Sequence, residues 1–172
     1  LDVIVNEPQP LTINEVVSNI SCYGANDGSV ITNVSGGTSP YNYVWSNSTN
    51  GTSITGLSAG SYSLTVTDSN NCSVSGSYTI IEPAELSASY VVSQYGNYNV
   101  SGIGACDGSI DLTLTGGTAP FNYNWNSGHT GQNLSNLCVG TYIVDITDAS
   151  GCTVTLNIVV TEPPPLNIPS GF

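Results

Sequence analysis

Basic side chains are almost absent from the sequence: none of its 172 residues is Lys or Arg, and one is His. Twelve Asp and Glu residues give a formal net charge of −12 at pH 7. Nucleic acids and anionic membrane surfaces are bound largely through Lys and Arg contacts with phosphate groups. We therefore expect no nucleic acid and no anionic membrane surface among the partners of this chain.

Long apolar runs are also missing. No stretch approaches the 18 or more apolar residues of a membrane-spanning helix, and no basic segment precedes an apolar one as in a signal peptide. We expect no membrane insertion, and we interpret the sequence as a soluble segment of a longer chain.

The residues that are abundant favour strands and turns. The chain has 19 Gly and 10 Tyr, together with many Ser, Thr, Asn and Val residues. Aromatic and β-branched side chains fill pleated surfaces, whereas Gly, Asn and Asp occupy turns. Five cysteines in such a chain favour an oxidising compartment, because small extracellular domains commonly depend on disulfides. We therefore expect an extracellular location.

The sequence contains an internal repeat. Residues 105–126, ACDGSIDLTLTGGTAPFNYNWN, closely match residues 25–46, ANDGSVITNVSGGTSPYNYVWS, and the match continues without a gap to Glu-Pro at 162–163 and 82–83. This pattern predicts one repeat over 9–83 and a second over 84–163. Residues 1–8 resemble the last strand of a preceding repeat, and residues 164–172 a linker or the start of a following one.

Within each copy the apolar residues alternate with polar ones. Segments such as SIDLTLT, YNYVW and SYSLTV have a period of two, and turn signals such as NDG, SGGTSP and TDSNN separate them. Six or seven short strands with this spacing predict an all-β fold, made of tandem immunoglobulin-like antiparallel β-sandwich domains. The Trp of the third strand is expected in the core, and the LSAGSY and LCVGTY segments resemble a tyrosine corner.

The cysteines differ between the two copies. They are Cys22, Cys72, Cys106, Cys138 and Cys152. In the first copy Asn26 and Ser58 stand where the second has Cys106 and Cys138, so we expect those two cysteines to pair. We also expect Cys22 to pair with Cys72, which leaves Cys152 as a free thiol because Gly102 replaces its partner. The rival pairing joins Cys106 to Cys152 and frees Cys138.

The motifs DGSI, GGTAPFNYNW, LCVGTYIVDITDASGC and TEPPPL of the second copy have counterparts throughout the first. In these motifs the chain resembles the SprB-type repeats of giant Bacteroidetes cell-surface adhesins, including those of gliding motility. The sequence departs from the family pattern at Gly102, Phe121 and Asn71. The resemblance implies an exported, surface-displayed array, and it supplies no catalytic residue.

The acidic residues could serve chemistry, metal binding or turns. No catalytic motif is present, His129 lies in a loop string, and Cys152 has no basic sequence neighbour to activate it, so we expect no enzymatic activity. Because the chain has no Lys or Arg, its carboxylates depend on water, N–H groups or a hard cation such as Ca²⁺. The candidate Ca²⁺ ligands are Asp27, Asp68, Asp107, Asp148 and Glu82. The competing interpretation is that the aspartates form turns and that the acids keep the surface solvated.

Two functions are consistent with these features. The first is a structural and adhesive repeat of a very large surface protein, acting as a stiff stalk in attachment or gliding, with neighbouring repeats as partners. The alternative is a carbohydrate-binding module, in which Tyr23, Tyr95 and Tyr98 stack on a surface polysaccharide. Clustering of these tyrosines would favour sugar binding, and their scatter would favour the stalk.

Overall fold

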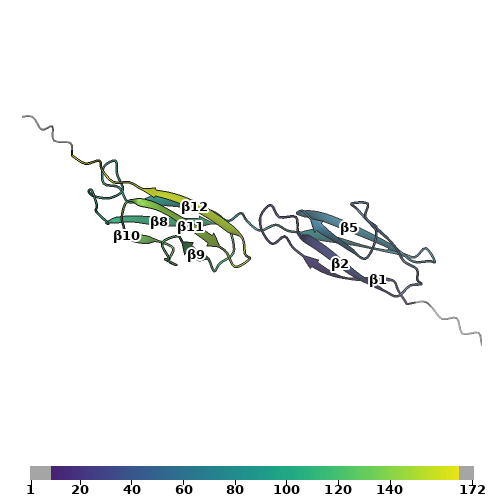
Figure 1. The fold of residues 1–172 in the computed structure, drawn as a ribbon. Coiled ribbons are helices and arrows are strands. Elements are labelled where there is room, and N and C mark those ends of the chain that lie inside the picture. The colour runs from purple at the N-terminus through teal and green to yellow at the C-terminus, as the bar shows by residue number, and fades with distance from the viewer. Residues whose placement is uncertain (1–8, 167–172) are drawn as a thin grey trace, which may run out of the picture. The chain divides into compact units, whose positions relative to one another are not determined.

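The computed structural model describes residues 9–166, and every regular element in that range is a β-strand. The chain divides between Pro83 and Ala84 into two compact units, which we call unit 1 and unit 2 (Figure 1). No helix in the described range is long and apolar enough to cross a membrane. The segments 1–8 and 167–172, on which part of the expectations about neighbouring repeats depends, lie outside the described residues.

Unit 1 is formed by six antiparallel strands in two sheets. They are β1 (Thr12–Ser18), β2 (Gly28–Ser35), β3 (Asn42–Trp45), β4 (Ser53–Leu57), β5 (Gly60–Thr67) and β6 (Ser73–Ile80). One sheet has the order β1-β2-β4 and the other β3-β5-β6. In the naming of immunoglobulin strands these are A-B-E and C-F-G, so the strand order itself defines an immunoglobulin-like sandwich.

Unit 2 repeats this architecture. Its strands are β7 (Ser87–Val92), β8 (Gly108–Thr115), β9 (Asn122–Trp125), β10 (Leu134–Leu137), β11 (Gly140–Thr147) and β12 (Thr153–Val160). Its sheets have the orders β7-β8-β10 and β9-β11-β12. The predicted all-β fold of immunoglobulin-like antiparallel sandwiches is therefore confirmed.

A buried tryptophan lies at the centre of each core, as expected. Trp45 ends β3 and Trp125 ends β9; both are 2% exposed and both donate their indole N–H to a backbone carbonyl, of Gly51 and Gly131 respectively. The Trp45 ring lies 5.7 Å from the ring of Tyr78. Each tryptophan thus buries its apolar surface without leaving its polar atom unpaired.

The predicted tyrosine corners are present. The hydroxyl of Tyr62, near the start of β5, donates to the carbonyl oxygen of Ser58 at 3.1 Å. In unit 2 the hydroxyl of Tyr142 donates to the carbonyl oxygen of Cys138 at the same distance. These bonds fix the turn that joins the two sheets, as they do in other immunoglobulin-like domains.

The strand pairings define two ends of each unit. The chain enters unit 1 at the end that carries residues 36–41 and 68–72, because Thr12 pairs with Ser35 and Thr67 pairs with both Asn42 and Ser73. We call this the leading end. The chain leaves at the opposite end, which carries residues 19–27 and 58–59 and which we call the trailing end. Strands β1 and β6 therefore both run from the leading end to the trailing end.

The Gly-Gly-Thr motif lets the entering backbone of each unit pack directly against the turn that follows the second strand. A Cβ atom on Gly36 would clash with the carbonyl oxygen of Pro10, and one on Gly116 with that of Glu85. Both glycines also have positive φ, 73° and 66°, which side-chain-bearing residues rarely adopt. The motif is thus required by the backbone at the leading end of each unit.

Candidate functional site

The trailing end of each unit holds the departing chain in place. In unit 1 the N–H of Ile20 donates to the carbonyl of Ile81 at 3.1 Å, and the N–H of Ile81 donates to Asn19 Oδ1 at 3.1 Å. The N–H of Gly24 then donates to Glu82 Oε1 at 2.6 Å. We call this set of bonds the trailing clamp.

Unit 2 has an equivalent trailing clamp. The N–H of Asn99 donates to the carbonyl of Thr161 at 2.9 Å, and the N–H of Thr161 donates back to Asn99 Oδ1 at 2.9 Å. Glu162 Oε2 accepts the N–H of Gly104 at 2.8 Å. Sequence reasoning assigned no role to Asn19 and Asn99, although their recurrence at the same repeat position was a usable signal.

The leading end contains a rigid turn built on one buried carboxylate. Asp68 is 5% exposed; its Oδ2 accepts the N–H of Thr38 at 2.9 Å, and its Oδ1 accepts those of Asn70 and Cys72 at 2.9 and 2.8 Å. The pKa of Asp68 is lowered, chiefly by the hydrogen bond from the Thr38 N–H. Burial raises this pKa, but the N–H groups of Cys72 and Asn70 lower it further, so the net shift is downward.

Asp148 forms the same turn in unit 2, with N–H groups of Thr118, Ser150 and Cys152 at 2.8 to 2.9 Å. Burial raises the pKa of Asp148, but the donated hydrogen bonds together outweigh it and the net pKa is lowered. Both aspartates therefore act as turn-forming residues.

The other two candidate aspartates hold the loops of the trailing end. Asp27 accepts the N–H of Ser21 at 3.0 Å and its hydroxyl at 2.5 Å, and these bonds lower its pKa, the hydroxyl most. Asp107 accepts the N–H of Ser101 at 3.0 Å, and its pKa is lowered in the same way. Each carboxylate spans six residues of its loop.

The five proposed Ca²⁺ ligands are not brought together. Within residues 9–166 no group of three or more His, Cys, Asp or Glu side chains is placed to hold a metal ion. Asp68 lies at the leading end of unit 1 and Asp27 and Glu82 at the trailing end, while Asp107 and Asp148 belong to unit 2. Since backbone N–H groups bind all five carboxylates, the structure favours the turn interpretation over the metal one.

One predicted disulfide is confirmed. Cys106 and Cys138 are bonded, with a Cα–Cα distance of 3.9 Å and a sequence separation of 32. Cys106 precedes β8 and Cys138 lies between β10 and β11, so both belong to the trailing end of unit 2. The rival pairing of Cys106 with Cys152 is excluded by this bond.

The predicted Cys22–Cys72 pairing is wrong, and so is the prediction of a free Cys152. Cys72 is an exposed free thiol, whereas Cys22 and Cys152 are each disulfide-bonded. The physical reason is that Cys22 lies in the trailing-end loop of unit 1 and Cys72 in its leading-end turn. The eight-residue strand β5 separates these ends by about 25 Å, far beyond the reach of a disulfide.

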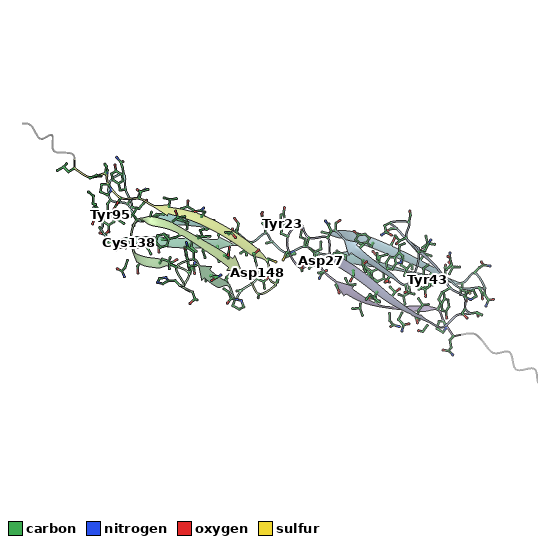
Figure 2. The ribbon with its side chains drawn as sticks, viewed as in Figure 1. Tyr23, Asp27, Tyr43, Tyr95, Cys138 and Asp148 are labelled. Atoms are coloured by element: carbon green, nitrogen blue, oxygen red, sulfur yellow. A yellow bond between two sulfur atoms is a disulfide. The ribbon has the colours of Figure 1, made fainter. Side chains whose placement is uncertain are left out.

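The candidate sugar-binding tyrosines are divided between the units. Tyr23 is 56% exposed in a loop of unit 1, whereas Tyr95 is 43% exposed in unit 2, near Cys138 (Figure 2). Tyr95 and Tyr98 exchange backbone hydrogen bonds in the five-residue insertion, and the Tyr95 hydroxyl donates to the Asp107 carbonyl at 3.3 Å. Neither unit therefore gathers all three rings.

His129 belongs to an exposed turn. Its Nδ1 lies 3.1 Å from the hydroxyl of Ser127, and its carbonyl accepts the N–H of Trp125. These contacts stay within one loop, so they give His129 a role in local structure.

Strand order, the buried third-strand tryptophan and the tyrosine corner together define each unit as an immunoglobulin-like domain. The family model of the SprB repeat matches the chain twice, at residues 14–50 and 99–130, once in each unit. The matched segments contain the trailing-end loop, the Gly-Gly-Thr motif and the buried tryptophan. They include the DGSI and GGTAPFNYNW motifs of the sequence resemblance and their counterparts in unit 1, whereas LCVGTYIVDITDASGC and TEPPPL lie outside the matched segments.

Three solved structures are similar to the chain at low sequence identity. A chain from "Structural basis for Dscam isoform specificity" is 12% identical with a TM-score of 0.39; the match covers 91% of our chain and 47%, about half, of that one. An amphioxus IgVJ-C2 molecule is 13% identical over 91% of our chain and 98% of its own, with a TM-score of 0.33. A chain from the crystal structure of Dpr11 IG1 bound to DIP-gamma IG+IG2 is 11% identical, over 89% of our chain and 98% of its own, with a TM-score of 0.34.

These TM-scores lie below 0.5, so the fold assignment rests on strand order, the buried tryptophan and the tyrosine corner of each unit and not on these matches. None of the curated proteins compared with the chain matches it.

Proposed function

We propose that the chain is a structural and adhesive repeat segment of a very large, surface-exposed adhesin, and that it carries tension as a stalk or filament in attachment or gliding motility. The two SprB repeat matches support a surface adhesin, and the disulfide between Cys106 and Cys138 supports an extracellular location. In this proposal the chain is not catalytic, and its partners are neighbouring repeats.

The observation that carries the tension-bearing role is the path of the chain through each unit. Tension enters unit 1 at the leading end of β1 and leaves from the trailing end of β6, so it pulls the two strands in opposite directions along their length. The seven paired residues of β1 and β2 and the trailing clamp are then loaded together in shear. Bonds that share a load in this way resist force better than bonds that open one after another.

The trailing clamp offers a direct test by single-molecule pulling from the two ends of the chain. All variants are made in the background C22S/C72S/C152S. This background removes the disulfides of Cys22 and Cys152, which would limit how far the chain extends, and the free thiol of Cys72, which could form a new one. We expect Asn19→Ala to lower the unfolding force of one of the two units. Asn70→Ala is the matched control, since Asn70 donates to Thr38 Oγ1 at 2.9 Å away from the β1–β6 path. Equal forces for both variants would contradict the proposal.

The carbohydrate-binding alternative has a separate test. The exposed rings of Tyr23 and Tyr95 are the groups that would stack on a sugar. Binding of the chain to an array of surface polysaccharides, lost in Tyr23→Ala or Tyr95→Ala, would favour this alternative. The division of the rings between two units favours the stalk.

A further inference from the structure

Cys72 has a chemically reactive side chain that plays no part in the proposed tension-bearing role. It is an exposed free thiol in the turn between β5 and β6. The turn is rigid, because Asp68 binds three backbone N–H groups and the N–H of Asp68 also donates to the Cys72 carbonyl at 2.9 Å. The thiol is therefore presented in a fixed place at the leading end of unit 1.

The second repeat provides an independent observation on this position. Cys152 lies in the equivalent turn, where its N–H donates to Asp148 Oδ1 at 2.9 Å as that of Cys72 does to Asp68 Oδ1 at 2.8 Å. Unlike Cys72, Cys152 is disulfide-bonded. The same turn, with the same hydrogen bonds, thus carries a disulfide in one repeat and a free thiol in the other.

A partner for Cys72 has to come from outside unit 1. The other cysteine of that unit, Cys22, is already disulfide-bonded and lies at the opposite, trailing end. The position of Cys72 at the leading end means that a preceding copy of the repeat would be attached on its side. In such a copy the counterpart of Cys22 lies in the loop that clamps the departing chain, just before the next copy begins.

We infer that Cys72 is a covalent docking point for another copy of the repeat, which bonds to it through the cysteine at the position of Cys22. The inference rests on the proposed function, in which repeats follow one another along one chain. A disulfide at this place would fasten the start of one repeat to the end of the one before it.

The bond would form by thiol–disulfide exchange with a low-molecular-weight disulfide. The Cys72 thiolate attacks that disulfide, which gives a mixed disulfide and releases one small thiol. The thiolate of the other copy then attacks the Cys72 sulfur and releases the second small thiol. Two cysteine thiols thus lose two protons and two electrons, and one small disulfide is reduced.

The test replaces residues 1–8 by a further copy of residues 9–83, joined directly to residue 9, and refolds this extended chain in a buffer of oxidised and reduced glutathione. Free thiols are then alkylated and located by mass spectrometry after pepsin digestion, since trypsin has no Lys or Arg to cleave. In the original chain we expect the label on Cys72. In the extended chain we expect Cys72 unlabelled and cross-linked, with the label on its counterpart in the added copy.

The matched control carries serine at the added copy's counterpart of Cys22, and there Cys72 is expected to be labelled again. A labelled Cys72 in the extended chain would overturn the inference, provided that the fluorescence of the added tryptophan shows its copy to be folded. If that copy is unfolded, the original chain is instead mixed with a peptide of the same loop, residues 19–27, in the same glutathione buffer. Failure of Cys72 to form a disulfide with this peptide would also contradict the inference. In either case the pulling experiment on Asn19 would still test the proposed function separately.

Discussion

Ser48 and Gly128 occupy the same turn position in the two repeats, and both have the left-handed backbone conformation, with φ of 66° and 83°. Their N–H groups donate to the carbonyls of Trp45 and Trp125 at 3.0 and 2.9 Å. The backbone geometry is the same, but only glycine adopts it without steric cost. At the residue scale, the two repeats therefore serve as controls for each other.

The first prediction exchanges these two residues. Ser48→Gly should stabilise unit 1 by about 1 kcal/mol, and Gly128→Ser should destabilise unit 2 by about the same amount, because a left-handed side-chain-bearing residue costs about 1–2 kcal/mol. Urea unfolding followed by tryptophan fluorescence measures both, since each unit has one buried tryptophan and a Trp→Phe change in the other unit isolates its signal. A change of the same sign at both positions would contradict this account.

The second prediction concerns acid. The N–H groups bound to Asp68 lower its pKa in the folded state, below the ordinary value of about 3.9 that applies when the chain is unfolded. The stabilisation is therefore complete above the unfolded pKa and is lost as the pH falls through the folded pKa. Asp68→Asn should be less stable than the parent at pH 7, and the difference should shrink below about pH 4.

Urea unfolding of unit 1 between pH 2 and pH 7 tests this directly. Asp111→Asn serves as the control in the second repeat. A destabilisation by Asp68→Asn that stays constant over the whole pH range would show that the carboxylate charge is not the cause.

At the scale of elements, the crossover between β3 and β4 decides which loops share an end. Strict alternation of six antiparallel strands would place the first and fifth loops at the same end of the sandwich. Strands β3 and β4 instead run in the same direction. Strand β3 is antiparallel to β5 and β4 is antiparallel to β2, and both β2 and β5 run from the trailing end to the leading end. The fourth loop therefore joins the first at the trailing end, and the fifth lies at the leading end.

This crossover explains which disulfide could be predicted. Comparison of the repeats shows that Cys106 and Cys138 occur together, and the first and fourth loops do lie at one end. The same comparison suggested Cys22 with Cys72, but these cysteines lie in the first and fifth loops. Strand periodicity, the buried tryptophans and the tyrosine corners follow from local patterns, whereas the direction of each strand depends on how the two sheets pack.

A third prediction transfers the disulfide to unit 1. Asn26 and Ser58 stand where unit 2 has Cys106 and Cys138, in loops of the same end. The double variant N26C/S58C should form a bridge between these two residues and stabilise unit 1, by about 4 kcal/mol on the chain-entropy estimate for a loop of this length.

Non-reducing peptide mapping and urea unfolding, with and without dithiothreitol, measure the bond and its effect. The single variants Asn26→Cys and Ser58→Cys are the controls. If no bridge forms, or if the bridged protein gains no stability over its reduced form, the equivalence of the two trailing ends would be wrong.

At the scale of the whole molecule, the chain is built from two units with the same strand order, the same turn aspartates and the same trailing clamps. The units differ in their cysteines: unit 2 contains the Cys106–Cys138 bond, and Cys72 of unit 1 is free. Repetition with the chain entering at one end and leaving at the other suits a segment that transmits tension. The carboxylates and the absence of Lys and Arg give the chain a formal net charge of −12, and we expect this charge to keep copies apart in solution.

The most direct measurement of this account is the length released when the C22S/C72S/C152S variant is pulled from its two ends. We predict two separate unfolding events, of which one is shorter by about 110 Å, because the Cys106–Cys138 bond withholds 32 residues of about 3.5 Å each. Addition of dithiothreitol should make the two lengths nearly equal. A single event would contradict the central claim that the chain is two separately folded, tension-bearing repeats, and two events of equal length before reduction would contradict the Cys106–Cys138 bond within unit 2.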